Sequence, residues 1–292
     1  MDCQSSLLTQ GFAYLQTQPL VDNERKNVMA LSKSLFHDKI VGEEISGRVW
    51  QVDIDSLAKE ESLGGNMANL VATYFDKIFN QHTSPLAASV LGGKVKSLPG
   101  RKLLISDQDC EAQQIHLDNL LPIFVSNLYL HDSDGELDGT QFYEMPSEEK
   151  MVGKPIDFND SRQDSRLKLP WTEHKLISPP FVKSGSLGVF FANTLHNGPS
   201  VTLPGLRCVM FQCCALEDTE IPADFSNYQH FAFSYALERF GLKEITRESL
   251  KASQGSWELH GPDGLGEYSQ KQLQNFLKNK PTKRKKRKKQ AS

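Results

Sequence analysis

The sequence predicts an α+β protein in which a β-sandwich or small barrel is flanked by helices on both sides along the chain. Three observations lead to this prediction. Residues 5–90 carry apolar side chains mostly at helical spacing, residues 101–216 contain short runs of β-type composition, and residues 228–242 return to a helical pattern. At 292 residues with 38% hydrophobic side chains the chain can bury a substantial core, and we expect one large domain.

Two segments near the start of the chain have the clearest helical spacing. They are residues 23–36, with Val28, Leu31 and Leu35, and residues 67–79, with Leu70, Tyr74 and Ile78. Side chains three or four positions apart lie on one face of a helix, so each set predicts a buried face. Gly92 and Gly93, followed by Pro99 and Gly100, mark the end of this helical part.

Six short runs after residue 100 have the composition of strands. They are RKLLIS (101–106), AQQIHLD (112–118), PIFVSNLYL (122–130), TQFYEM (140–145), LGVFFA (187–192) and LRCVMFQCCAL (206–216). Each is rich in aliphatic or aromatic residues and bounded by polar or turn-forming segments. Their number and spacing predict the β-sandwich or small barrel.

A polar stretch between Pro146 and Pro170 is longer than an ordinary connection between strands. Two interpretations of it stay open, a lid over a site and a disordered insertion. After the helical pattern at residues 228–242, residues 270–280 predict a last short helix before a basic tail.

The charge is distributed unevenly along the chain. Residues 283–289 (KRKKRKK) contribute seven positive charges, so the rest of the chain carries −10 against a total of −3. An acidic body argues against a broad phosphate-binding surface on the folded part. No apolar run is long enough to span a membrane, and the first residues lack a signal-peptide pattern, so we expect a soluble intracellular protein. Five cysteines without CxxC spacing suit reduced thiols.

The run AQQIHLD places a histidine and an aspartate two positions apart. In a strand this spacing puts His116 and Asp118 on one face, and Ile115 and Leu117 on the other. An imidazole and a carboxylate then converge on one point. Such a pair also arises by chance, and a core histidine with a strand-end aspartate is the alternative interpretation.

A second histidine follows at the end of a predicted strand. His196 closes the run LGVFFANTLH, directly before the turn signal Asn197-Gly198-Pro199, so its ring can point back into a barrel mouth. With His116 and Asp118 it makes a 2-His-1-carboxylate set. Such a set leaves iron positions open for an oxo acid and O₂.

Arg207 begins the next predicted strand, eleven residues after His196. It shares one face of that strand with Val209, Phe211 and Cys213, and a charged residue on an otherwise apolar inward face needs an anionic partner. A guanidinium binds a carboxylate through two hydrogen bonds, as the distal carboxylate of 2-oxoglutarate would require.

Other histidines fit the pattern less well. His131 and Asp132 are adjacent, so in a strand they would face opposite ways, and a turn before the loop at residues 133–135 suits them better. His174 has no apolar strand before it, and His230 begins a helical pattern. We therefore expect His196 to be the distal ligand.

The order HxD, distal His and Arg eleven residues later, with QQIHLD and GSLGVFFANTLHNGP around the ligands, resembles the Fe(II)/2-oxoglutarate-dependent dioxygenase superfamily. Within it, the sequence is most similar to the phytanoyl-CoA-dioxygenase-type enzymes. The resemblance covers roughly residues 90–217. The sequence departs from this subfamily after the HxD, where LHDSDGELDGTQFYEM lacks the Gly-Ser-His segment often found there.

The resemblance implies a double-stranded β-helix (jelly-roll) core with flanking N- and C-terminal helices. It implies Fe(II) bound by His116, Asp118 and His196, 2-oxoglutarate anchored by Arg207, and O₂ as oxidant. Related halogenases lack this carboxylate and bind halide in its place. Asp118 therefore implies a hydroxylase-type reaction, which includes demethylation, in which 2-oxoglutarate is decarboxylated to succinate and CO₂. We expect a helical scaffold packed on the core at residues 1–90, the oxygenase domain with its C-terminal helices at residues 91–280, and a disordered tail at residues 281–292.

Further polar residues accompany this core. Asn127 and Tyr129 share the inward face of a predicted strand and are candidates for hydrogen bonds to the co-substrate; ordinary core positions are the alternative. Lys102 is a weaker candidate of the same kind.

The tail at residues 283–289 suits nuclear targeting, with weak polyanion binding as a second property; a solvated charge run is the alternative. The primary substrate is not identified by the sequence. Two other functions compete with a hydroxylase: a non-catalytic jelly-roll binding or scaffold protein, and a nucleic-acid-directed oxygenase that uses the tail. The complete ligand set argues against the first, and the acidic body against the second.

Overall fold

The structure is a computed structural model, and it describes residues 3–15, 18–37, 43–45, 49–108, 110–113, 118, 123–131, 135–144 and 175–219. The stretch between residues 145 and 174, the helices predicted at residues 228–242 and 270–280, and the basic tail lie outside these residues. Within the described residues no helix is long and apolar enough to cross a membrane.

Helices and strands are mixed in the described part of the chain up to residue 91, and only strands follow after it. They are α1 (Cys3–Gln10), β1 (Phe12–Leu15), α2 (Asp22–His37), β2 (Glu43–Ile45), β3 (Val49–Asp53), α3 (Ile54–Leu57), α4 (Leu63–Ile78), the π-helical segment η2 (Phe79–Thr83), α5 (Ser84–Leu91), β4 (Val95–Ser97), β5 (Lys102–Ser106), β6 (Phe124–His131), β7 (Glu136–Asp138), β8 (Gln141–Phe142), β9 (Phe181–Lys183), β10 (Leu187–Phe191), β11 (His196–Asn197) and β12 (Arg207–Leu216).

An antiparallel main sheet dominates the structure. Its strand order is β1-β10-β6-β12-β5-β3-β2, and β4 also pairs with β12. Two small sheets, β11-β8 and β7-β9, stand apart from it. Nine of the ten residues of the central strand β12 are buried. Both faces of this strand are therefore covered, and its sequence lacks the regular alternation of apolar and polar residues that marks a strand with one solvent-exposed face.

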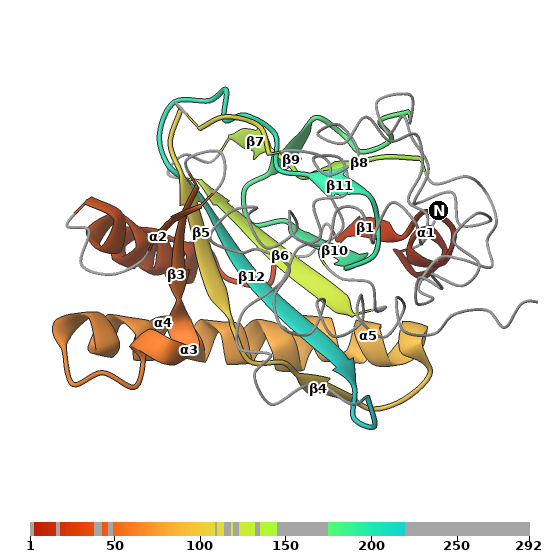
Figure 1. The fold of residues 1–292 in the computed structure, drawn as a ribbon, viewed down its shortest axis with the longest axis horizontal. Coiled ribbons are helices and arrows are strands. Elements are labelled where there is room, and N and C mark those ends of the chain that lie inside the picture. Colours follow the sequence, from red (N-terminus) through yellow and green to blue (C-terminus); the bar gives the residue numbers. More distant parts are fainter. Residues whose placement is uncertain are drawn as a thin grey trace, which may run out of the picture.

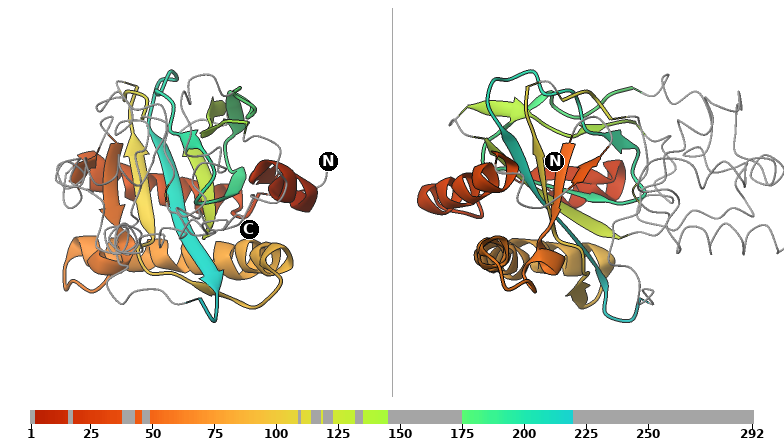
Figure 2. Two further views of the ribbon diagram at one scale, coloured as in Figure 1. Left: turned by 45° about the vertical axis from the view of Figure 1, so that its right-hand side comes forward. Right: turned by 60° about the vertical axis from the view of Figure 1, so that its left-hand side comes forward.

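The two faces of the main sheet have different neighbours. Figures 1 and 2 show α2 and α4 on one side and the short strands β7, β8, β9 and β11 on the other. On the helix side, Cys208, Met210 and Cys214 of β12 belong to one apolar cluster with residues of α2 and α4. On the other side, Phe211 and Cys213 pack with Phe142 of β8. The molecule is therefore layered, with helices, main sheet and small sheets in that order.

The N-terminal part is helical where the spacing predicted it, but it also adds strands. α2 and α4 cover residues 23–36 and most of residues 67–79, and Gly92, in the left-handed conformation at φ 78°, ends α5. β1, β2 and β3 were not predicted. These strands are short, and pairing with β10 and β5, which no local pattern reveals, holds β1 and β3 in the sheet.

The buried face of α4 differs from the predicted one. Ala68, Val71, Phe75 and Ile78 are buried, whereas Leu70 is 57% exposed. The predicted set Leu70, Tyr74 and Ile78 is thus correct only in part. The neighbouring row of side chains faces the sheet, and the spacing alone fits both rows.

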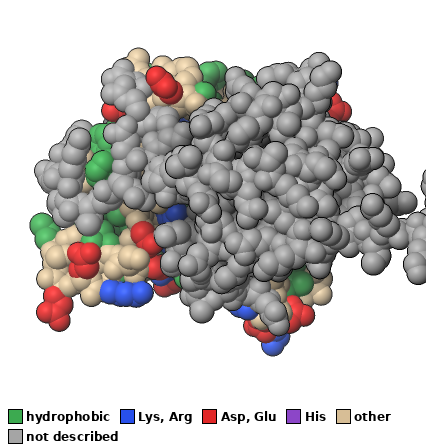
Figure 3. All heavy atoms as spheres, in the orientation of Figure 1, with side chains coloured by type: hydrophobic (Ala, Val, Ile, Leu, Met, Phe, Trp, Pro, Cys, Tyr) green, Lys and Arg blue, Asp and Glu red, His purple; other side chains and the backbone are tan. Residues whose placement is uncertain are grey.

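A charged cluster joins α3, α4 and the start of β5. The Arg101 guanidinium contacts Oδ1 of Asp55 at 2.7 Å and Oδ1 of Asp76 at 2.7 Å, and it lies over the ring of Phe75 at 5.7 Å. Asp55 also accepts hydrogen bonds from the backbone N–H groups of Gly100 and Arg101. In Figure 3, acidic and basic side chains are interspersed over the lower left of the molecule, where α3 and α4 lie in Figure 1.

Replacing Arg101 by alanine should lower the free energy of unfolding by about 2 kcal/mol, because a half-buried carboxylate loses its charged hydrogen bonds. Urea unfolding followed by circular dichroism measures this. Lys59→Ala, at an exposed position next to α3, is the matched control and should change the value by less than about 0.5 kcal/mol. Equal effects of the two substitutions would contradict a stabilising role for the cluster.

The same cluster has a pH signature. Burial acts to raise the pKa of Asp55, but the hydrogen bonds from Arg101 and Gly100 outweigh it and the pKa is lowered. A lowered folded-state pKa contributes stability above the ordinary carboxyl value, and that stability is lost as pH falls through the folded-state pKa. The Arg101→Ala protein should therefore lose less stability on acidification than the wild type.

Candidate active site

One face of the main sheet carries the predicted site residues. We call it the site face; it bears Arg207, Val209, Phe211 and Cys213 of β12. Residues paired across antiparallel strands share a face. Arg207 pairs with Ser106 of β5 and His131 of β6, and Phe211 pairs with Lys102 of β5 and Asn127 of β6. The site face therefore brings polar residues from three strands together.

His196 and Asp118 form a buried pair at the Cys213 end of the site face. Nε2 of His196 lies 3.1 Å from Oδ2 of Asp118, and the two residues are 5% and 4% exposed. The His196 ring packs against the Phe190 ring with centroids 4.8 Å apart, and Phe190 stands opposite Val125, itself opposite Cys213. The backbone N–H of Asp118 donates to the carbonyl of Ala192 at 2.8 Å, which fixes this residue beside β10.

The second ring nitrogen of His196 determines what the pair can bind. Nδ1 lies 2.8 Å from the carbonyl oxygen of Thr194, and only an N–H can donate there. In the neutral ring Nε2 then carries a lone pair that faces a carboxylate oxygen. Two lone pairs at this distance repel each other unless a cation, either a proton or a metal ion, lies between them.

The pKa of His196 agrees with a cation between His196 and Asp118. Burial acts to lower the pKa of His196, but Asp118 and the hydrogen bond to Thr194 outweigh it, and the pKa is raised. The pair therefore attracts positive charge. A histidine whose Nδ1–H is held by a backbone carbonyl is also a common arrangement for a metal-binding imidazole, because the hydrogen bond fixes both tautomer and ring orientation.

The remaining predicted ligand, His116, lies outside the described residues, as do His174 and His230. Among the residues that are described, no group of three His, Cys, Asp or Glu side chains could hold a metal ion. The strand predicted at residues 112–118 is absent at its described positions, Ala112, Gln113 and Asp118, which belong to no strand. Gln113 is held instead by the segment after His196, with its N–H donating to the carbonyl of Gly198 at 2.8 Å.

Arg207 is a buried cation that forms no ion pair with a described residue. It is 7% exposed, its Nε donates to Oγ of Ser106 at 3.2 Å, and an Nη donates to the carbonyl of Asp138 at 3.3 Å. The Asp138 carboxylate accepts hydrogen bonds from the backbone N–H and from the hydroxyl of Thr202, both at 2.9 Å. No carboxylate of a described residue lies within ion-pair distance of Arg207.

A buried guanidinium in this setting is costly for the protein by itself. Burial lowers the pKa of Arg207, and Cys110, Tyr129 and Asp138 act to raise it again. Arginine keeps its proton even so. A charge of this kind is stabilised by an anion that brings acceptor oxygens to the free part of the guanidinium.

Asn127 and Tyr129 both lie on the site face, Tyr129 opposite Val209 and near Arg207, and Asn127 opposite Phe211, farther along β12. The Tyr129 hydroxyl is 2.7 Å from Oγ1 of Thr140, and both residues are buried. Oδ1 of Asn127 is buried and has no hydrogen-bond partner among the described residues. A buried acceptor without a donor is uncommon in proteins, and a bound ligand with an N–H or O–H group would satisfy it.

No protein-family model and no curated protein sequence matches the chain. Solved structures do match. AviO1 from Streptomyces viridochromogenes Tue57 is 14% identical, with a TM-score of 0.50 over 76% of this chain and 96% of that one. The non-heme alpha ketoglutarate dependent carbocyclase SnoK is 12% identical, with a TM-score of 0.52 over 77% and 88%. The epimerase SnoN, in complex with Fe³⁺, alpha ketoglutarate and nogalamycin RO, is 14% identical, with a TM-score of 0.50 over 77% and 91%.

The chain has the α+β double-stranded β-helix fold. At these identities the likeness concerns the fold alone. The main sheet and the two small sheets that face it form the jelly roll, and the predicted core is confirmed.

Within the double-stranded β-helix, the structure adds residues that the sequence did not single out. Ser106, Asp138 and Thr140 surround Arg207 and Tyr129, and Thr202 holds Asp138. Ser106, Asp138 and Thr140 lie at or beside strand ends, and Thr202 lies in the segment between β11 and β12. Only the position of Ser106 at the end of the run RKLLIS gave a usable signal, because a strand paired with β12 would place it beside Arg207.

Lys102 is closer to the site than its weak sequence signal suggested. It is buried on the site face, opposite Phe211. Burial raises the pKa of the Cys213 thiol; Asp118 raises it further, and Lys102 acts to lower it. Lys102 and Asp118 thus both lie near Cys213, and this thiol stays protonated at neutral pH.

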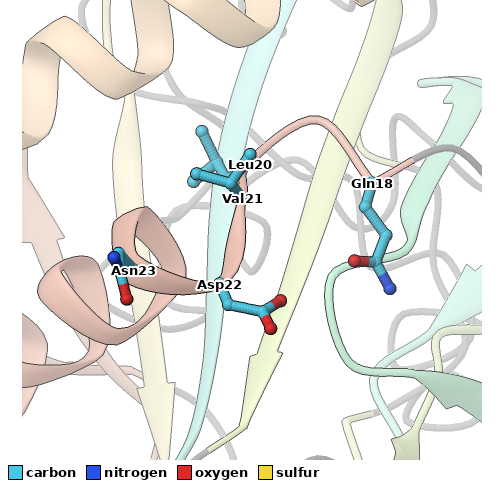
Figure 4. A pocket seen from close by; sticks show the side chains of 5 residues that line it. All are labelled: Gln18, Leu20, Val21, Asp22 and Asn23. Carbon is cyan, nitrogen blue, oxygen red and sulfur yellow. The ribbon is translucent and has the colours of Figure 1, made fainter.

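A surface pocket of about 400 Å³ lies elsewhere, at the loop before α2. Gln18, Leu20, Val21, Asp22 and Asn23 line it (Figure 4). Leu20 belongs to the apolar cluster on the helix side of the main sheet, whereas the site face lies on the opposite side. Among the described residues that line it, Asp22 is the only titratable side chain, and it pairs with Arg25.

Proposed function

We propose that the chain is an Fe(II)- and 2-oxoglutarate-dependent oxygenase of the hydroxylase type. One observation carries this proposal: the same face of a double-stranded β-helix presents a buried His–Asp pair that requires a cation and a buried arginine that requires an anion. A metal ion and a dicarboxylate satisfy the two requirements together.

The donor set fits iron. Asp118 and His196 supply one carboxylate oxygen and one imidazole nitrogen, and His116 is the proposed third ligand. Two imidazoles and one carboxylate suit Fe(II) and leave positions for a chelating oxo acid and O₂. Bound Fe(II) supplies the chemistry by which O₂ oxidises the primary substrate while 2-oxoglutarate is converted to succinate and CO₂.

The other residues bind and orient the co-substrate. Arg207 receives the distal carboxylate through its free N–H groups, and Ser106 and the Asp138 carbonyl hold the guanidinium in one orientation. Tyr129 offers its hydroxyl and Asn127 its side-chain amide N–H as donors to the co-substrate, while the Asn127 oxygen stays available to a donor on the primary substrate. The rings of Phe142 and Phe190 pack on His196 and exclude water from one side of the ligand pair.

The reaction type and the subfamily belong to this proposal as well. The similar structures include a carbocyclase and an epimerase, so the fold is compatible with several outcomes of the same chemistry. Asp118 at the carboxylate position argues against halogenation, and we propose hydroxylation among the remaining outcomes. The relationship to phytanoyl-CoA-dioxygenase-type enzymes rests on the sequence motifs quoted above. A non-catalytic binding protein is disfavoured because loss of activity usually shows as a lost ligand, whereas Asp118, His196 and Arg207 are all present and buried.

The test is succinate release by the purified full-length chain. With Fe(II), 2-oxoglutarate and O₂, the protein should form succinate, slowly without a primary substrate and faster when a suitable pool of small molecules is added. Omitting Fe(II) or O₂ should each abolish the product. Succinate formation that persists without added metal in the presence of a chelator would contradict the proposal.

We further propose that residues 283–289 direct the protein to the nucleus and that residues 281–292 are separate from the catalytic unit at residues 91–280. Residues 1–90 are proposed as a scaffold packed on this unit; the scaffold is not wholly helical, because β1, β2 and β3 are strands of the main sheet. The support is compositional: the tail contains seven consecutive basic residues after Pro281 and no apolar residue among them.

Truncation after Asn279 should leave the rate of succinate formation unchanged and shift a fluorescent fusion from nucleus to cytosol. The truncated protein should also lose most of any salt-sensitive affinity for RNA, because fewer basic residues contact phosphates. A truncated protein that stays nuclear and loses activity would favour the nucleic-acid-directed oxygenase instead.

A further inference from the structure

The N-terminal strand β1 brings a tyrosine to the site face from a part of the chain predicted to be helical. β1 pairs with β10, with Tyr14 opposite Gly188, and Gly188 in turn stands opposite Asn127 of β6. Tyr14 therefore lies in the same row across the sheet as Asn127. Burial and the neighbouring Tyr129 both raise its pKa, so its hydroxyl is protonated and can donate a hydrogen bond.

That hydroxyl contacts Thr140 and also interacts with Tyr129. It donates to the carbonyl of Thr140 at 2.8 Å, and the side chain of Thr140 lies 2.7 Å from the hydroxyl of Tyr129. Thr140 is thus held at its backbone by one tyrosine and at its side chain by the other. A threonine fixed in this way determines where the Tyr129 hydroxyl lies.

Two glycines make room for this arrangement. A Cβ on Gly188 would lie 2.8 Å from Cε2 of Tyr129 and 3.1 Å from Cε1 of Tyr14, so the two rings converge over bare backbone. A Cβ on Gly139 would lie 3.2 Å from the Tyr14 hydroxyl and 3.0 Å from Val182. The close approach of Tyr14 to the segment at residues 138–140 depends on these positions.

The same short segment carries the contact of Arg207. Asp138, two residues before Thr140, gives its carbonyl to the guanidinium at 3.3 Å. Tyr14 and Tyr129 both lie near enough to Arg207 to offset part of the effect of burial on its pKa. One hydrogen bond from β1 therefore restrains a segment that positions both Tyr129 and Arg207.

The geometry points to Tyr14 as a positioning residue for the co-substrate: from β1 it holds Thr140 and, through Thr140, sets the Tyr129 hydroxyl and the backbone acceptor of Arg207 for a carboxylate of 2-oxoglutarate. This inference rests on the proposed function. It adds a part of the co-substrate site that comes from the N-terminal strand, and Tyr14 does not itself have to touch 2-oxoglutarate.

The experiment is a calorimetric titration of 2-oxoglutarate into the full-length chain with Fe(II), in the absence of O₂. Tyr14→Phe removes only the hydroxyl and should weaken the affinity roughly three- to tenfold, the range that corresponds to one neutral hydrogen bond. Tyr74→Phe is the matched control, since its hydroxyl lies 3.5 Å from Asn27 on the helix side. It should bind 2-oxoglutarate as the wild type does.

A second arm tests the route through Tyr129. If Tyr14 acts by placing that hydroxyl, Tyr14→Phe should have little further effect in a chain that already carries Tyr129→Phe. Fully additive losses would overturn this route. A Tyr14→Phe protein that binds 2-oxoglutarate like the wild type, even with a lower melting temperature, would overturn the inference while leaving the proposed function intact. A folded wild-type chain that does not bind 2-oxoglutarate at all would overturn both.

Discussion

Replacing Asp118 or His196 by alanine is expected to lower Fe(II)-dependent succinate formation by at least about a hundredfold, the largest effect that we expect of any single substitution. Each substitution removes one of two groups whose lone pairs face each other at 3.1 Å. A chelating site that loses a ligand loses both affinity for the ion and control of its open positions. Succinate measured in metal-defined buffer gives the result directly.

The ligand substitutions need a control for general damage to the fold. His82→Ala changes a partly exposed histidine in η2 and should keep full activity. The Asp118→Ala protein should still unfold cooperatively, because the pair lies at one end of the site face and contributes little apolar surface to the core. Wild-type activity in either ligand variant would show that the metal is bound elsewhere.

The second large effect is expected at Arg207. Arg207→Ala should weaken 2-oxoglutarate binding by roughly a hundredfold or more, because truncating one partner of a buried charged pair leaves the other charge desolvated and unpaired. Fe(II) affinity should change far less, since the guanidinium contacts Ser106 and Asp138 and not the His–Asp pair. Titration of the metal and of the co-substrate into the same protein separates the two effects.

Arg207→Lys refines this expectation. A lysine keeps the charge but cannot form two parallel hydrogen bonds with one carboxylate, so its affinity should fall between those of the wild type and Arg207→Ala. An unchanged affinity in Arg207→Ala would place the anchor elsewhere. Lys102, buried on the same face opposite Phe211, would then be the next candidate.

The central strands could be predicted from the sequence because their signal is local. β5, β6, β10 and β12 coincide with four of the predicted runs, and each is a short apolar segment bounded by turns. β1 and β3 carry no comparable signal. They exist because β10 and β5 offer them an edge to pair with, and this is information that lies more than forty residues away in the chain.

The residues of the candidate site also fall into those with a local signal in the sequence and those without one. Asp118, His196 and Arg207 could be proposed from the sequence because ionisable residues beside apolar runs are unusual and because their order is distinctive. Thr140, Asp138 and Tyr14 could not, since a threonine in a loop or a tyrosine near the N-terminus is ordinary until the fold places it beside Tyr129. Residues whose role is to hold other residues leave no pattern of their own in a single sequence.

The most direct test of the proposed site measures how many equivalents of Fe(II) and 2-oxoglutarate bind, and in which order, in the absence of O₂. The full-length chain should bind about one equivalent of Fe(II), and 2-oxoglutarate should bind tightly only after the metal, because Fe(II) and Arg207 hold its two ends. Asp118→Ala should lose the metal and, with it, the metal-dependent part of 2-oxoglutarate binding. Tight binding of 2-oxoglutarate that is the same with and without Fe(II), or Fe(II) binding that Asp118→Ala and His196→Ala leave unchanged, would contradict a metal-dependent oxygenase site on this face of the sheet.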